Sequence, residues 1–238
     1  MKFHIALITF TALTLFCCNP KAQKNASAVT IVGAMRNVMW KGELLGNINV
    51  DTIASRKGLY GLGPVEYLTG EILIIDGRSY KSTVVSDTSM KVEETFSISA
   101  PFFSYGNIAK WRERSLPDSV QTNQHLEQYL DRITMHSPRP FLFKLTGTVE
   151  KAKIHIVNLP EGSTVSSPAD AHMGQVNYDL KNEHSEIIGF FSTEHKSIFT
   201  HHDTFLHMHL ITADRQKMGH LDEILMTKGT MKLYLPAE

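Results

Sequence analysis

The chain has 238 residues with 24 basic and 24 acidic side chains, so its formal charge is zero. Hydrophobic residues make up 42% and charged residues 20% of it, proportions that exclude wholesale disorder and a multi-span membrane protein. Because there is no net positive charge and no block of Lys and Arg, we expect no nucleic-acid partner. The length allows one large domain or two small ones.

The first residues predict an export signal. A basic start precedes an apolar stretch, residues 3–16, that is too short to span a bilayer comfortably. The boundary resembles a bacterial lipobox in which Cys18 is the acylated residue, and we prefer it over cleavage at Ala26-Ser27-Ala28. We therefore expect residues 1–18 to be a lipoprotein-type signal, residues 19–28 a tether, and the protein to be exported, either periplasmic or membrane-anchored.

Both cysteines of the chain, Cys17 and Cys18, lie in this N-terminal segment. Neither cleavage leaves a pair to cross-link the mature fold, so disulfides cannot stabilise it. The folded region also has no cysteine to act as a nucleophile or metal ligand. Its chemistry must come from His, carboxylates, hydroxyls, Lys and Arg.

The mature chain begins with a weak helical pattern and then its clearest hairpin. Apolar spacing over residues 35–45 predicts a short helix that Gly46 ends. The glycine-rich residues 58–64 predict a loop whose backbone approaches another part of the protein closely. Residues 71–85 then predict a β-hairpin around Asp76-Gly77, which is a type I′ turn signal.

One helix and several strands follow this hairpin. A capping-box pattern from Asp118 to Gln121, followed by apolar positions at spacings of four and three, predicts a helix over residues 119–134. Further strands are expected at residues 141–145, 153–157 and 186–191. Because strands outnumber helices and do not alternate with them regularly, the predicted class is α+β with a mixed or antiparallel sheet.

Seven of the twelve histidines gather near the C-terminal end of the chain. Residues 205–211 look like a strand, on which His207 and His209 project from one face at a separation suited to one metal ion. The loop of residues 212–219 brings the chain back to His220, as a third ligand on a neighbouring strand requires. Three neutral nitrogen ligands with an open fourth position describe a catalytic zinc or a similar divalent metal.

A second explanation of the histidines stands beside this one. A His-x-His pair on a half-buried strand often reflects surface composition, so the spacing alone leaves metal binding open. Among the other histidines of this region, His195 and the His201-His202 pair are expected in solvated loops.

Several motifs of the chain occur together in one known family. In the C-terminal part they are Gly189-Phe190-Phe191-Ser192, Phe205 to Ile211, Asp214-Arg215 and Gly219-His220. They resemble the C-terminal half of bacterial α-acetolactate decarboxylase. The segment from Gly61-Leu62-Gly63 through Gly70-Glu71 to Asp76-Gly77 is similar to the glycine-led hairpin of its N-terminal half, and residues 141–147 to its central strand. The chain is identified as a divergent member from about residue 37 onward.

The resemblance implies a decarboxylase and its site residues. The family converts 2-acetolactate, a 2-hydroxy-3-oxo acid, to acetoin and carbon dioxide through a metal-bound enediolate. The family's three zinc-binding histidines match His207, His209 and His220. Glu71 matches an active-site glutamate, which implies a role in proton transfer.

The resemblance also implies an architecture. The family has two β-rich halves with the metal in the cleft between them, as a homodimer. In this chain the halves correspond to residues 29–140, which include the predicted helix, and residues 141–238, which carry the histidines.

Three departures from the family concern its catalytic apparatus. Lys144 stands where the family has an arginine opposite the substrate's carboxylate, and lysine lacks the planar two-pronged geometry of arginine. Pro64 replaces a threonine, and the chain stops at Glu238, before a further glutamate of the family. These departures favour an alternative, a catalytically degenerate exported member that binds a metal and a ligand, whereas Glu71 and Asp214-Arg215 favour the decarboxylase.

Overall fold

The fold is described from a computed structural model, which describes residues 29–200 and 204–237. The predicted export signal with Cys18, the tether, the His201-His202 pair and Glu238 lie outside the described residues. Within the described ranges, no helix combines the length and apolar character needed to cross a bilayer.

Strands make up most of the described chain, and the helices are few and short. The helices are α1 (Met35–Lys41), α2 (Asn123–Ile133) and α3 (Pro168–Ala171), with 3-10 turns η1 (Val50–Thr52) and η2 (Glu66–Leu68). The strands are β1 (Thr30–Val32), β2 (Ile48–Asn49), β3 (Leu59–Pro64), β4 (Glu71–Ile75), β5 (Arg78–Ser86), β6 (Ser89–Glu94), β7 (Ser99–Ala100), β8 (Phe103–Asn107), β9 (Trp111–Ser115), β10 (Phe141–Ile156), β11 (Val176–Phe191), β12 (Leu206–Thr212), β13 (Met218–Met226) and β14 (Lys232–Pro236). The prediction of a β-rich fold with few helices is confirmed.

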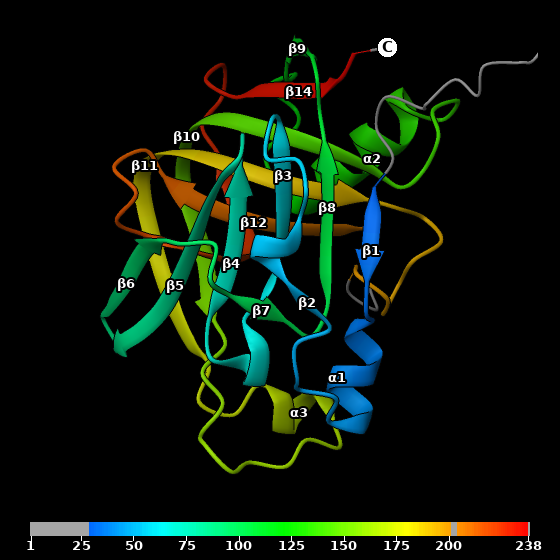
Figure 1. The fold of residues 1–238 in the computed structure, drawn as a ribbon. Helices are drawn as coiled ribbons and strands as arrows, with labels where there is room; N and C mark the ends of the chain where they lie inside the picture. The colour runs from blue at the N-terminus through cyan, green and yellow to red at the C-terminus, as the bar shows by residue number, and fades with distance from the viewer. Residues whose placement is uncertain (1–28, 201–203, 238) are drawn as a thin grey trace, which may run out of the picture.

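The first sheet comes from the N-terminal part of the chain and has the order β1-β8-β3-β4-β5-β6, with each pair antiparallel (Figure 1). Its central strand β4 is buried along its whole length. Leu73 and Ile75 belong to one hydrophobic cluster and Ile72 and Ile74 to another, because successive side chains point to opposite faces. By the same alternation Glu71 points to the face of Leu73 and Ile75.

The second sheet has the order β11-β12-β13-β10-β14-β9 and closes partly on itself. The long strand β10 pairs with β11 along one edge, and along its other edge with β14 and then β13, all antiparallel. Because β11 also pairs with β12, and β12 with β13, these four strands form a ring. In Figure 1 the upright strands of the first sheet lie in front of this ring, whose strands run across behind them.

The two sheets share one hydrophobic cluster, in which Leu73 of β4 packs with Leu142, Ile188 and Ile211 of the second sheet. His207 and His209 alternate in step with Ile211 along β12, so they face the first sheet as well. The inter-sheet face is therefore where side chains from the two sheets meet.

The hairpin and the strand of the histidines agree with the sequence predictions. The strand predicted at residues 205–211 is β12 (Leu206–Thr212). β4 and β5 pair around Asp76 and Gly77, whose φ angles of 47° and 78° are the positive values that a type I′ turn needs. The strands expected at residues 141–145 and 153–157 are one continuous strand, β10.

The two predicted helices, α1 and α2, have boundaries that differ from the predicted ones. α1 ends at Lys41, not near Gly46, because Gly42 takes the left-handed conformation (φ 65°) of a C-cap. α2 begins at Asn123 and not at residue 119, because the Thr122 side chain, as N-cap, accepts a hydrogen bond from the backbone N–H of His125.

The prediction of a loop at residues 58–64 is wrong, because most of this segment is the buried strand β3. A Cβ on Gly61 would lie 2.8 Å from the Phe103 ring, so glycine allows β3 to lie against that ring. The sequence predicted a close approach of the backbone in a loop, and the structure has this close approach within a sheet.

Strand β9 belongs to the second sheet, although it precedes residue 140, where the sequence analysis divided the two halves. It pairs with β14 from Trp111 to Ser115. Helix α2 also packs against the second sheet, where Leu126 and Leu130 belong to a cluster with Phe143 of β10.

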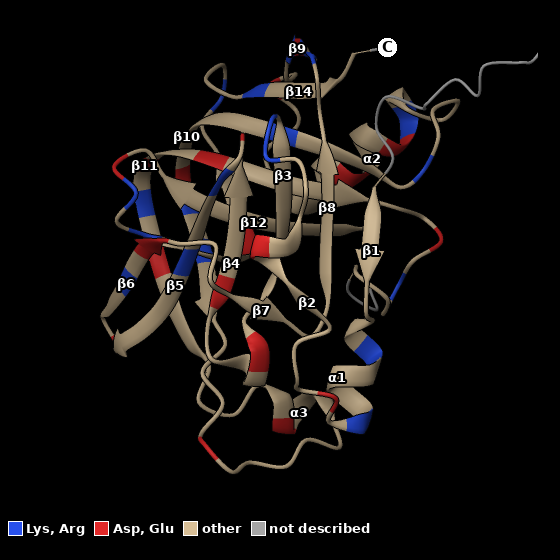
Figure 2. Ribbon diagram, viewed as in Figure 1, with Lys and Arg blue, Asp and Glu red and all other residues tan. Residues whose placement is uncertain are grey.

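Charged residues of both signs lie side by side on β5 and β6 (Figure 2). Glu93 on β6 forms ion pairs with Lys81 of β5 at 2.6 Å and with Lys91 at 2.5 Å, and Arg78 pairs with Glu94 at 2.5 Å. β6 is an outer strand of the first sheet, and charges on such an edge oppose pairing with another chain.

Candidate metal centre

Three buried histidines on two neighbouring strands face one another. His207 and His209 lie two residues apart on β12, and His220 on β13 is the register partner of His209. Each is at most 7% exposed and offers a ring nitrogen within 4.8 Å of those of the other two. Their ring centroids are 5.0 to 5.4 Å apart. The structure thus brings together the three histidines that the sequence analysis grouped.

This donor set fits a divalent metal ion. Imidazole nitrogens suit zinc and other divalent transition metals, and three of them leave further coordination positions open. Because both cysteines precede residue 29, the described part of the chain offers no thiolate, and the donors that this group of three supplies are imidazole nitrogens. The described geometry could therefore hold an ion between β12 and β13.

Glu71 reaches this group from the first sheet. Its Oε2 lies 3.6 Å from Nε2 of His209, and the backbone N–H of Val157 donates a hydrogen bond to its Oε1 at 3.3 Å. Burial raises the pKa of Glu71 well above its usual value, the Val157 hydrogen bond opposes this, and the charge of Asp222 adds to it. Its register partner on β3 is Pro64.

A cavity of about 30 Å³ lies where these side chains meet, roughly the space of one water molecule. Its polar lining consists of Glu71, His155, His172, His207 and His220. Its apolar lining includes Met35 and Met39 of α1, whose side chains are flexible. The cavity therefore has a polar wall of histidines and one carboxylate, and an adaptable apolar wall.

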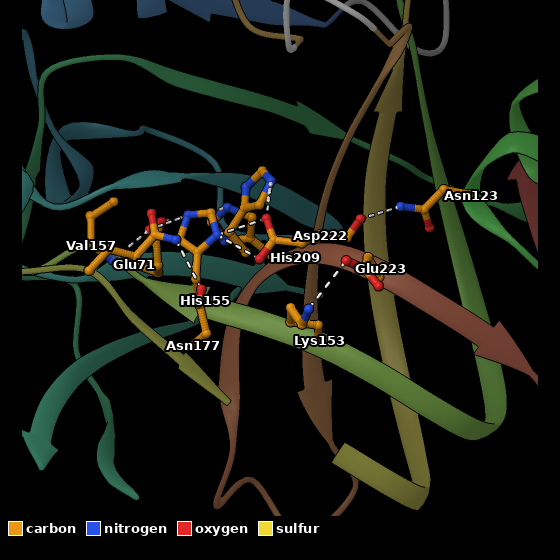
Figure 3. Close-up of polar contacts among 11 residues, drawn as sticks. Glu71, Asn123, Lys153, His155, Val157, Asn177, His209, Asp222 and Glu223 are labelled. Carbon is orange, nitrogen blue, oxygen red and sulfur yellow. Dashed lines mark hydrogen bonds and ion pairs between the residues drawn. The ribbon is translucent and has the colours of Figure 1, made fainter. Parts of the chain in front are cut away.

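His155 and its partner Asp222 were not predicted from the sequence. Figure 3 shows His155 of β10 between Glu71 and Asp222. Its Nδ1 lies 2.8 and 2.9 Å from the two carboxylate oxygens of Asp222, and its Nε2 lies 4.0 Å from Oε1 of Glu71. Its ring stacks on His220 with centroids 4.6 Å apart. The available signals were a histidine among the aliphatic residues of a predicted strand and an aspartate two residues after His220.

His172 also lines the cavity, at the C-cap of α3. Desolvation by the surrounding protein lowers its pKa, the nearby His155 lowers it further, and Asp222 acts in the opposite direction. Its ring centroid lies 6.3 Å from that of His155.

Lys144 lies on the same face of the sheet as His209 but two strands away. It is the register partner of Ile188 on β11, which in turn pairs with His209. Its ammonium lies 5.5 and 4.6 Å from the ring centroids of Trp111 and Tyr234. Those rings belong to β9 and β14, neither of which carries one of the three histidines. Its role opposite a substrate carboxylate stays a prediction.

Comparison with known proteins agrees with the motifs. The family model for alpha-acetolactate decarboxylase matches residues 32–236. The alpha-acetolactate decarboxylase of Lactococcus lactis subsp. lactis (strain IL1403) is 22% identical over 217 residues, covering 89% of this chain and 82% of that protein. That of Methanosarcina mazei is 25% identical over 218 residues, covering 90% and 72%.

Among solved structures, that of alpha-acetolactate decarboxylase from Bacillus subtilis strain 168 has a similar fold. The TM-score is 0.70 at 19% sequence identity, with 88% of this chain and 86% of that chain covered. At that identity the likeness shows the fold. Because the family model spans nearly all described residues, the chain belongs to the alpha-acetolactate decarboxylase family.

Proposed function

We propose that this protein decarboxylates 2-acetolactate, or a closely related 2-hydroxy-3-oxo acid, to acetoin and carbon dioxide with the help of a bound divalent metal, for which zinc is our candidate. The observation that carries the proposal is the group of three buried imidazoles with the Glu71 carboxylate 3.6 Å away. Family membership supports the reaction class. The histidines support metal binding, and Glu71 supports the proton transfer.

His207, His209 and His220 are the residues that would hold the ion. A bound divalent ion would act as a Lewis acid toward the substrate's oxygens and stabilise the negative charge left when carbon dioxide departs. The three rings come from paired strands, so their positions are fixed before any ligand binds.

Glu71 is the proposed proton-transfer residue. Loss of carbon dioxide leaves an electron pair on carbon, and one proton must be added there to give the neutral product. Glu71 is 3% exposed, so it can give its proton to a bound substrate without competition from bulk water. The hydrogen bond from Val157 holds the carboxyl in place.

The test combines product formation with metal analysis. Purified zinc-loaded protein should form acetoin from 2-acetolactate faster than a protein-free blank. The double substitution His207→Ala and His209→Ala should abolish both bound metal and acetoin formation, whereas His184→Ala, at an exposed position of β11, should change neither. Full metal content without acetoin formation would refute the decarboxylase and leave the binding role, and unchanged metal in the double variant would refute the site.

A further inference from the structure

We propose that His155, held by Asp222, is the side chain that binds the substrate's hydroxyl group on the wall of the cavity beside Glu71. This inference rests on the proposed function. It concerns two residues that neither the metal group nor the proton-transfer step uses.

The strand pairing places His155 in the site. His155 on β10 is the register partner of His220 on β13, so both rings project from the same face. A Cβ on Gly219 would lie 2.5 Å from the carbonyl oxygen of His155, so a residue with a side chain there would push β13 away from β10. Glycine thus permits the close approach that stacks the two rings.

A β-bulge directs Asp222 toward His155. The register passes from Lys153 opposite Glu223 to Ile154 opposite Leu221, which leaves Asp222 as the extra residue on β13. The carbonyl of Asp222 accepts a hydrogen bond from Asn123 Nδ2 at 2.6 Å, so the first residue of α2 supports the bulge. Bulges of this kind re-aim side chains.

The contact with Asp222 fixes which nitrogen of His155 faces the cavity. A carboxylate only accepts hydrogen bonds, so Nδ1 of His155 carries the hydrogen and donates it to Asp222. Nε2 is then the ring nitrogen that is left to accept a hydrogen bond. That atom lies 4.0 Å from Glu71 Oε1, which is too far for a direct hydrogen bond.

An acceptor at this position selects one group of the substrate. A 2-hydroxy-3-oxo carboxylate has acceptor oxygens on its carboxylate and ketone, and its hydroxyl is the only donor. The hydroxyl is therefore the group that can satisfy Nε2 of His155. His155 would bind the substrate directly, and Asp222 is a positioning residue that acts through it.

The test measures how strongly the protein recognises a hydroxyl group, independently of turnover. Binding of 2-hydroxyisobutyrate and of isobutyrate, which lacks the hydroxyl, is compared by calorimetry on zinc-loaded protein. His155→Phe keeps a stacking ring but no nitrogen, and should reduce the preference for the hydroxy acid by about 3- to 10-fold, the worth of one hydrogen bond. Asp222→Asn should reduce it similarly, because an amide can donate to Nδ1 and reverse the tautomer.

Matched controls come from the adjacent exposed ion pair. Lys153→Gln and Glu223→Gln remove a pair with a 3.3 Å contact on the same two strands and should leave the preference unchanged. Metal content, measured in every variant, shows that the histidine group is intact.

The failure of this inference can be told apart from the failure of the proposed function. Equal losses for both ligands in His155→Phe, or an unchanged preference in metal-loaded His155→Phe, would overturn the assignment even if the wild-type protein forms acetoin. A wild-type protein that forms no acetoin, yet shows the predicted loss of hydroxyl preference in the variants, would refute the decarboxylase and support this contact.

Discussion

Replacement of Glu71 by glutamine tests the proton-transfer role most directly. The amide oxygen of Glu71→Gln can still accept the Val157 hydrogen bond, and the side chain keeps its size, so the free energy of unfolding should change by no more than about 1 kcal/mol. Removal of a positioned proton donor lowers kcat by about 10²- to 10⁴-fold, which corresponds to about 2.7–5.4 kcal/mol. The expected loss of activity is therefore larger than the expected change in the free energy of unfolding, so the two can be told apart.

The assay for this prediction measures acetoin formation as a function of pH, together with bound metal and thermal unfolding. Burial raises the pKa of Glu71 in the metal-free protein, whereas the charge of a bound divalent ion acts in the opposite direction. As Glu71 donates the proton, wild-type kcat should fall as pH rises through the pKa that this carboxyl has in the metal-loaded protein. The residual activity of Glu71→Gln should lack this decline. Glu66→Gln, on the nearby turn η2, is the control. Wild-type kcat in a metal-loaded Glu71→Gln variant would refute the reasoning.

Three further predictions concern the metal, Lys144 and a surface ion pair. Chelation should abolish acetoin formation and lower the melting temperature by about 5–16 °C, both restored by added zinc, because a metal that binds only the folded state stabilises it. Lys144→Met tests the predicted contact with the substrate carboxylate, which should show as a rise of about tenfold in KM for 2-acetolactate. A KM within about twofold, with a loss of about 0.5–1 kcal/mol in urea unfolding, would refute that contact and assign the ammonium to the aromatic rings beside it. Glu93→Gln should lower the free energy of unfolding at pH 7 by less than about 1 kcal/mol. Lys81 and Lys91 hold the pKa of Glu93 at about 2 against a usual 4.5, so this difference should be present above pH 4.5, shrink as pH falls and vanish near pH 2 in denaturant titrations.

Local sequence patterns predicted the parts of the site that single strands carry. Alternation over residues 205–211 placed His207 and His209 on one face, and Asp76-Gly77 predicted the turn that follows β4. These features depend on side-chain period and turn chemistry, which a few neighbouring residues determine.

The helix boundaries and strand β3 were harder to predict from the sequence. Several residues near the start of α2 are able to cap a helix, and the tertiary structure uses Thr122. The residues on either side of this cap, Gln121 and Asn123, donate hydrogen bonds to the distant strand β13. Glycines normally weaken a strand, but Gly61 is tolerated in β3 because the Phe103 ring occupies the space beside it. Both outcomes therefore depend on contacts between distant parts of the chain.

The sequence by itself determined that three histidines near the C-terminal end of the chain could share a metal and that the fold is rich in strands. Only the tertiary structure decided that Glu71 meets Val157, 86 residues away, and that His155 meets Asp222, 67 residues away. The physical reason is that strand register and a β-bulge bring these side chains together, and both depend on pairing between distant segments that local periodicity does not encode.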